Sequence, residues 1–179
     1  MVNTVVCIRH LSFTLAIRAV YEKLEVKEVD MRCCSIGFVT NSSSYVACII
    51  YSGKFDKEKF DAFSKNILNH KWISDEFRNN ETVKQIIPII IEKLRKILES
   101  STTVTFAFES MYDNPPHCTI TGCNDVLDIR DYFPEEWFDM DTAPEMWLED
   151  DNGYYFCEQL EKLLQESGFS NKRVVFDFR

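Results

Sequence analysis

The sequence lacks a long apolar run, an excess of positive charge and a glycine-rich phosphate loop. No uninterrupted apolar stretch is long enough to cross a bilayer, so no membrane segment is expected. Acids outnumber bases 29 to 20, which gives a formal net charge of −9. Binding to nucleic acid depends on neutralising phosphates, so direct binding to nucleic acid is not expected.

The chain also lacks a cysteine framework and a secretory leader. Its seven cysteines are odd in number and scattered, and Arg9, His10 and Arg18 interrupt the apolar stretch near the N-terminus. Apolar residues make up 45% of the chain, enough for the core of one folded domain. We therefore expect a reduced, cytoplasmic, soluble protein, and no motif in it predicts a cofactor.

A run of polar residues follows a short apolar segment near the start of the chain. Met31 and Arg32 precede Gly37-Phe38-Val39, and Thr40-Asn41-Ser42-Ser43-Ser44 comes next. Asn and Ser build turns by hydrogen-bonding their own backbone, which favours a tight connection between two strands. The alternative is an anion-binding loop of Asn41, Ser42, Ser43 and Ser44, although a phosphate loop would carry more glycines and a following lysine.

The same run resembles a signature that opens many uncharacterised bacterial and phage proteins. In that family a Met, basic residues, Gly-Phe-Val, Ser or Thr, Asn and several serines begin the chain. The resemblance covers Met31 to Ser44 and implies kinship without implying an activity. It predicts two parts, an N-terminal extension at 1–30 and a single α/β domain at 31–179, and it leaves open whether Met1 or Met31 is the start.

Hydrophobic spacing outlines the elements of that domain. Strands are predicted at 45–52, 103–109 and 173–178, and helices after residue 54, near 72–77, over 80–98 and over 154–167. Pro88 predicts a kink or break in the long helix. Residues 111–125 read as a loop or a hairpin centred on 118–122, within an irregular acidic insertion at about 111–152. The order of elements predicts an α/β or α+β fold, a single small sheet with helices packed on one side.

Two groups of residues could hold a metal. Asp125, Asp128 and Asp131 recur every three residues, and on a helix they would share a face. Asp113, Asp125 and Asp128 could together bind Mg²⁺, which would make the chain a small metal-dependent phosphoester or nucleotide-processing enzyme. His117, Cys118 and Cys123 could bind zinc. The simpler interpretation of the aspartates is an ordinary solvated face. The simpler interpretation of the second group is two small thiols beside a surface histidine.

The acidic insertion interleaves aromatic residues with carboxylates. Between Asp125 and Asp151 there are eleven acids and one base, so this segment carries −10 of the total charge. One interpretation is an interface, in which the aromatic and Met side chains contact a partner and the acids around them attract its basic surface. The alternative interpretation places the aromatics in the core and the acids in water. The predicted contact residues are Trp137, Phe138, Asp139, Met140, Asp141, Trp147 and Glu149.

The leading hypothesis is therefore a non-catalytic protein-binding module that contacts a protein with a basic surface.

Overall fold

A five-stranded antiparallel sheet forms one layer of the fold. The computed structural model describes residues 45–111, 114–148 and 151–178. The strands are β1 (Tyr45–Ser52), β2 (Thr103–Met111), β3 (Asn114–Thr121), β4 (Val126–Asp128) and β5 (Asn171–Phe178). Their order is β4-β3-β2-β1-β5, and each neighbouring pair is antiparallel.

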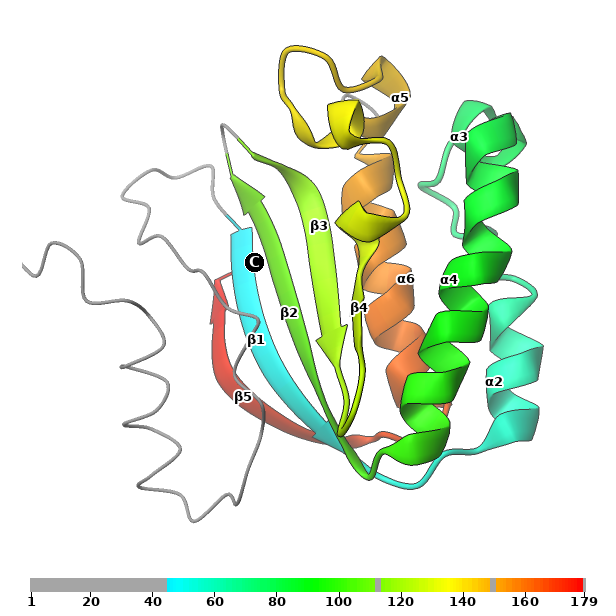
Figure 1. Cartoon of the computed structure of the whole chain (residues 1–179), viewed down its shortest axis with the longest axis vertical. Helices are drawn as coiled ribbons and strands as arrows, with labels where there is room; N and C mark the ends of the chain where they lie inside the picture. Colours follow the sequence, from blue (N-terminus) through cyan, green and yellow to red (C-terminus); the bar gives the residue numbers. More distant parts are fainter. Residues whose placement is uncertain (1–44, 112–113, 149–150, 179) are drawn as a thin grey trace, which may run out of the picture. The chain divides into compact units, whose positions relative to one another are not determined.

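The helices form the second layer, on one face of the sheet (Figure 1). They are α2 (Lys57–Ser64), α3 (Asp75–Asn79), α4 (Glu81–Ser100), α5 (Glu145–Leu148) and α6 (Asn152–Glu166), with short 3₁₀ turns η1 (Ile129–Asp131) and η2 (Glu135–Phe138). This arrangement confirms the prediction of an α+β fold with one small sheet and helices on one side. Within the described ranges, no helix is both long and apolar enough to cross a membrane.

Helix starts follow local capping. Asp56 accepts a hydrogen bond from the Lys59 amide, and Ser74 accepts one from the Phe77 amide. Asn80 accepts hydrogen bonds from the amides of Thr82 and Val83, so three polar side chains fix where α2, α3 and α4 begin.

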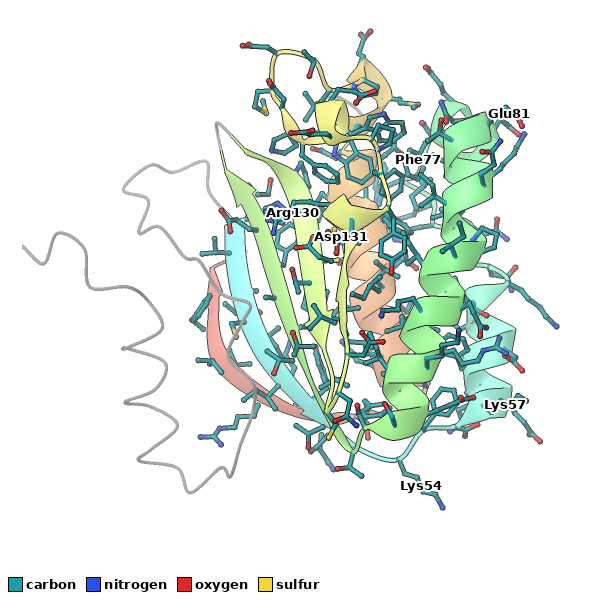
Figure 2. All side chains as sticks on the ribbon, viewed as in Figure 1. Lys54, Lys57, Phe77, Glu81, Arg130 and Asp131 are labelled. Atoms are coloured by element: carbon teal, nitrogen blue, oxygen red, sulfur yellow. The ribbon has the colours of Figure 1, made fainter. Side chains whose placement is uncertain are left out.

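The core lies between the two layers (Figure 2). Alternate residues of β2 point inward, and Val104, Phe106 and Phe108 are all buried. From the other layer, α4 contributes a buried apolar stripe at helical spacing, made of Val83, Ile87, Ile90, Leu94 and Ile97. The match of these two periodicities explains why the sequence forms one sheet covered on one face.

The predicted break at Pro88 is wrong, because α4 runs without interruption from Glu81 to Ser100. Pro88 lies on the exposed side of the helix, next to the buried Ile87 and near the buried Ile90. The carbonyl of Lys84, which loses its donor at Pro88, belongs to an exposed residue. Packing of the apolar stripe on both sides of the proline therefore holds the helix together.

The predicted loop is wrong, and the predicted hairpin is present but displaced: Asn114–Thr121 forms strand β3, which pairs with β2 and, across a turn at 122–125, with β4. The register shifts between Glu109 and Met111, across from Pro115 and Pro116. A bulge of this kind accommodates prolines that cannot donate to the ladder.

The chain divides into two compact units, Met1–Phe38 and Val39–Arg179, and every described residue belongs to the second. The predicted extension at 1–30 therefore lies outside the described residues.

Candidate functional site

Residues 131–151 are called here the acidic segment, and the two short helices within it, η2 and α5, lie at one end of the sheet (Figure 1). The chain carries no Lys, Arg or His from Asp131 to Glu161. The exposed carboxylates of the acidic segment are those of Asp131, Glu135, Glu136, Asp139, Asp141, Glu145 and Asp151. None of them forms an ion pair with a residue that the structure describes.

Some carboxylates on α2, α3 and α4 are paired with bases. Asp61 pairs with Arg95 at 2.9 Å, Asp75 pairs with Arg78 at 2.8 Å, and Glu81 pairs with Lys84 at 3.0 Å. The acidic segment thus leaves its charge to solvent or to a partner, whereas these helical acids are neutralised by neighbouring side chains.

Two predicted contact residues, Trp137 and Trp147, lie in the core and cannot reach a partner. Trp137 is 5% exposed and Trp147 is 0% exposed. The centroid of the Trp147 ring lies 5.1 Å from Phe133, 5.4 Å from Trp137 and 5.8 Å from Phe77. The prediction that these tryptophans present a binding surface is therefore corrected: their aromatic neighbours from α3 and the acidic segment bury them.

The remaining predicted contacts are more accessible. Asp139 and Asp141 are exposed, Met140 between them is 41% exposed, and Phe138 is half-buried. The Asp139 carboxylate accepts a hydrogen bond from the Asp141 amide at 2.9 Å, which orders the turn that presents Met140. Glu149 lies outside the described residues. The exposed tip at 139–141 is thus what remains of the predicted contact surface.

The predicted metal residues do not converge. Asp125 lies in a turn, Asp128 ends β4 and Asp131 belongs to η1, so the three do not share a helical face as expected. The structure describes no group of three or more His, Cys, Asp or Glu side chains that could hold a metal within its ranges. Asp113 lies outside those ranges.

Asp125 and Asp128 each hold a basic side chain instead. Asp125 accepts a hydrogen bond from Lys93, which lowers the pKa of that carboxyl. Burial raises the pKa of Asp128, but hydrogen bonds from the Arg130 guanidinium and amide outweigh burial and the net shift is downward. Both carboxylates therefore have a cation already in place.

His117 and Cys118 point to opposite faces of the sheet, as neighbours in a strand must. The Cys118 thiol hydrogen-bonds Cys157 of α6, and burial raises its pKa well above the usual range. The His117 ring nitrogen Nδ1 lies 3.1 Å from the carbonyl of Pro115, and Cys123 is exposed. The three residues considered as zinc ligands are thus separated.

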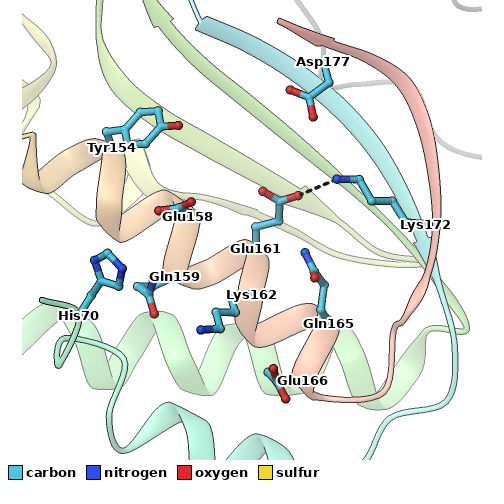
Figure 3. Close-up of a pocket in the computed structure, with 10 residues that line it drawn as sticks. All are labelled: His70, Tyr154, Glu158, Gln159, Glu161, Lys162, Gln165, Glu166, Lys172 and Asp177. Atoms are coloured by element: carbon cyan, nitrogen blue, oxygen red, sulfur yellow. Dashed lines mark ion pairs between the residues drawn. The ribbon is translucent and has the colours of Figure 1, made fainter. Parts of the chain in front are cut away.

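A cleft of about 740 Å³ lies along α6 beside β5, and sequence reasoning missed it (Figure 3). The carboxylate of Glu161 is almost fully buried there, and the Tyr51 hydroxyl donates a hydrogen bond to it. The ammonium of Lys172 lies 3.9 Å from the same carboxylate. In the sequence, the signal for this buried polar group is Tyr51 itself. It lies in a strand predicted to be buried, where its hydroxyl needs a polar partner.

The loop Asn41 to Ser44, predicted as a possible anion site, lies outside the described residues together with the rest of the signature. Comparison with models of known protein families, with curated proteins and with solved structures finds no match to this chain.

Proposed function

We propose that this chain is a non-catalytic binding protein whose acidic segment contacts a partner protein with a basic surface. The observation that supports this function is the gathering of exposed carboxylates, without ion pairs among the described residues, over 131–151. Complementary charge accelerates encounter and selects the partner, while an apolar anchor supplies affinity.

Met140 is the candidate anchor. Its side chain is 41% exposed at the tip of the segment, with Asp139 and Asp141 on either side. Methionine is enriched at interface cores, and its unbranched side chain adapts to the surface that it meets.

The buried aromatic cluster beneath the tip gives it a fixed support. The buried Trp147 contacts the rings of Phe133, Trp137 and Phe138, and these aromatic residues alternate in the sequence with the exposed acids. A preformed surface loses less conformational entropy on binding than a disordered one, so the acidic segment is suited to recognition without folding on the partner.

The test uses a fluorescein-labelled peptide that alternates Lys and Leu, with binding measured by fluorescence anisotropy at low and moderate salt. The triple variant Asp139→Asn/Asp141→Asn/Glu145→Gln is expected to weaken binding about tenfold, because the removed charges face the partner.

The matched control is Glu58→Gln/Glu76→Gln/Glu99→Gln, which removes three exposed acids from the helices and changes the net charge equally. This control is expected to weaken binding by less than about twofold. Equal losses in the two triple variants would mean attraction by net charge alone and would overturn the proposal.

Met140→Ser separates an interface from charge attraction, because it leaves every charge in place. We expect it to weaken binding about fivefold, the cost of losing a partly exposed apolar contact of this size. An unchanged affinity would remove Met140 as the anchor.

A further inference from the structure

His117 is a buried titratable group in contact with the acidic segment. The residue is 5% exposed, whereas His70, the other histidine that the structure describes, is partly exposed. Strand β3 carries His117, and both short turns, η1 and η2, contact this strand. The histidine is therefore enclosed where the sheet meets the acidic segment.

The neutral ring of His117 has a defined tautomer. Its Nδ1 atom lies 3.1 Å from the carbonyl oxygen of Pro115. Because a carbonyl oxygen only accepts hydrogen bonds, Nδ1 is the donor and carries the hydrogen of the neutral ring. Nε2 is then the basic nitrogen, and a further proton must bind there.

The charged groups that act on this ring come from three elements of the described chain. Glu109, the cross-strand neighbour on β2, places its Oε2 atom 3.9 Å from Nε2. Asp128 at the end of β4 and Arg130 in η1 also act on His117, but they pair with each other at 2.6 Å. The carboxylates on η2, which are exposed, are those of Glu135 and Glu136. Burial is the largest influence and lowers the pKa of His117, so the imidazole is neutral at pH 7.

Phe138 connects His117 to the exposed tip at 139–141. The Phe138 ring packs edge-on against the His117 ring, with 6.4 Å between centroids, and edge-on against Trp147 at 5.9 Å. The next residue, Asp139, caps the turn that presents Met140. One side chain therefore joins the buried histidine to the surface proposed to bind the partner.

A proton on Nε2 changes this arrangement. A buried imidazolium needs a hydrogen-bond acceptor, and 3.9 Å between Nε2 and the Glu109 oxygen is too long for a hydrogen bond. A charge-assisted hydrogen bond at about 2.8 Å requires the two side chains to approach by about 1 Å. Because the Phe138 ring packs against the histidine ring, this movement removes part of the support of Phe138.

We propose that His117 is a pH-sensitive switch of the acidic segment: protonation of Nε2 pairs the ring with Glu109, loosens Phe138 and weakens partner binding at the tip. This inference rests on the proposed function, because it concerns regulation of the same surface. The partner binds the neutral state more tightly, so affinity falls as the pH drops below about 6.5 and the folded chain takes up the proton. The added positive charge acts in the same direction, since it opposes a basic partner.

The primary experiment is a pH titration of the ¹⁵N-labelled full chain, which follows the His117 ring and the amides of Phe138 and Met140. Both amides are expected to shift with the midpoint of the His117 ring. His117→Asn should remove this component, since its side-chain amide retains a donor for the Pro115 carbonyl but does not titrate. The matched control His70→Asn should keep it. Amides that do not follow the His117 ring, or that titrate unchanged in His117→Asn, would overturn the proposal.

Glu109→Gln provides a second variant that retains the histidine. Removing the anionic acceptor disfavours the imidazolium, so the midpoints of the His117 ring and of the two amides are expected to move together to lower pH. Circular dichroism at each pH verifies that the variants remain folded. An unchanged midpoint would contradict the pairing of His117 with Glu109.

The consequence for binding is measured with the fluorescein-labelled Lys/Leu peptide at pH 7.5 and 5.0, where the peptide lysines stay charged. The loss of affinity at pH 5.0 is expected to be at least about threefold larger for the wild type than for His117→Asn, and equal for the wild type and His70→Asn. Carboxylate titration is common to all three proteins and cancels in this comparison. Equal losses in the wild type and His117→Asn would overturn the switch while leaving the binding function intact. Absence of peptide binding at both pH values would overturn the proposed function, and the amide titration would still decide whether His117 moves the tip.

Discussion

Trp147→Ala tests most sharply whether the aromatics of the acidic segment belong to the core. Trp147 is 0% exposed and contacts the rings of Phe77, Phe133, Trp137 and Phe138. A buried tryptophan removes about 150–250 Å² from water, and its truncation also leaves a cavity. We therefore expect a loss of about 4 kcal/mol in the free energy of unfolding.

For a domain of this size such a loss lowers the unfolding temperature by about 8–16 °C. The assay is urea unfolding followed by circular dichroism, so that loss of the indole does not remove the signal. Trp72→Ala is the control: Trp72 is 57% exposed and stacks on Tyr155, so its loss should cost less than about 1 kcal/mol. A Trp147→Ala protein as stable as the Trp72→Ala protein would refute the reasoning.

Trp147→Phe refines the same test. The Trp147 Nε1 atom is buried and has no hydrogen-bond partner among the described residues. Phenylalanine retains an aromatic ring and removes this unsatisfied donor, so the loss of volume is partly offset. We expect a cost of about 1 kcal/mol, well below that of Trp147→Ala.

Three further outcomes are expected. Burial lowers the pKa of His117 in the folded chain below its usual value of 6.5. As the pH falls, the unfolded chain therefore binds a proton at this histidine before the folded chain does. The free energy of unfolding should therefore fall as the pH drops through about 6.5, and His117→Asn should flatten that part of a urea-unfolding series across pH. Gly153→Ala places a Cβ 2.7 Å from Trp147 Cε2, so it should destabilise the protein by about 1–3 kcal/mol in the same assay. Pro88→Ala restores a helical donor at an exposed position and should raise the unfolding temperature measured by calorimetry; a lowered temperature would contradict the account of α4.

Elements with a clear period could be predicted from the sequence. Strand β1 spans Tyr45–Ser52 as expected, because its apolar run ends at Ser52-Gly53. The helix predicted over 80–98 from its long apolar stripe is confirmed as α4, and Asn80 caps it as predicted. Strand β3 was missed because Pro115 and Pro116 argue locally against a strand, while pairing with β2 decides the outcome.

The site was less predictable because it depends on contacts between distant residues. In the acidic segment, short 3₁₀ turns give no regular period, so the pattern alone could not separate the buried Trp137 from the exposed Met140. The cleft depends on Tyr51 meeting Glu161, 110 residues away in the chain, and only the assembled sheet and α6 bring them together.

Chemical-shift mapping of the ¹⁵N-labelled full chain with the basic Lys/Leu peptide tests the central claim most directly. Binding through the acidic segment predicts that the largest amide shifts fall at residues 135–145, with the amides around Glu58, Glu76 and Glu99 nearly unchanged. Shifts distributed evenly over the exposed acids of α2, α3 and α4, or confined to the α6–β5 cleft, would contradict it.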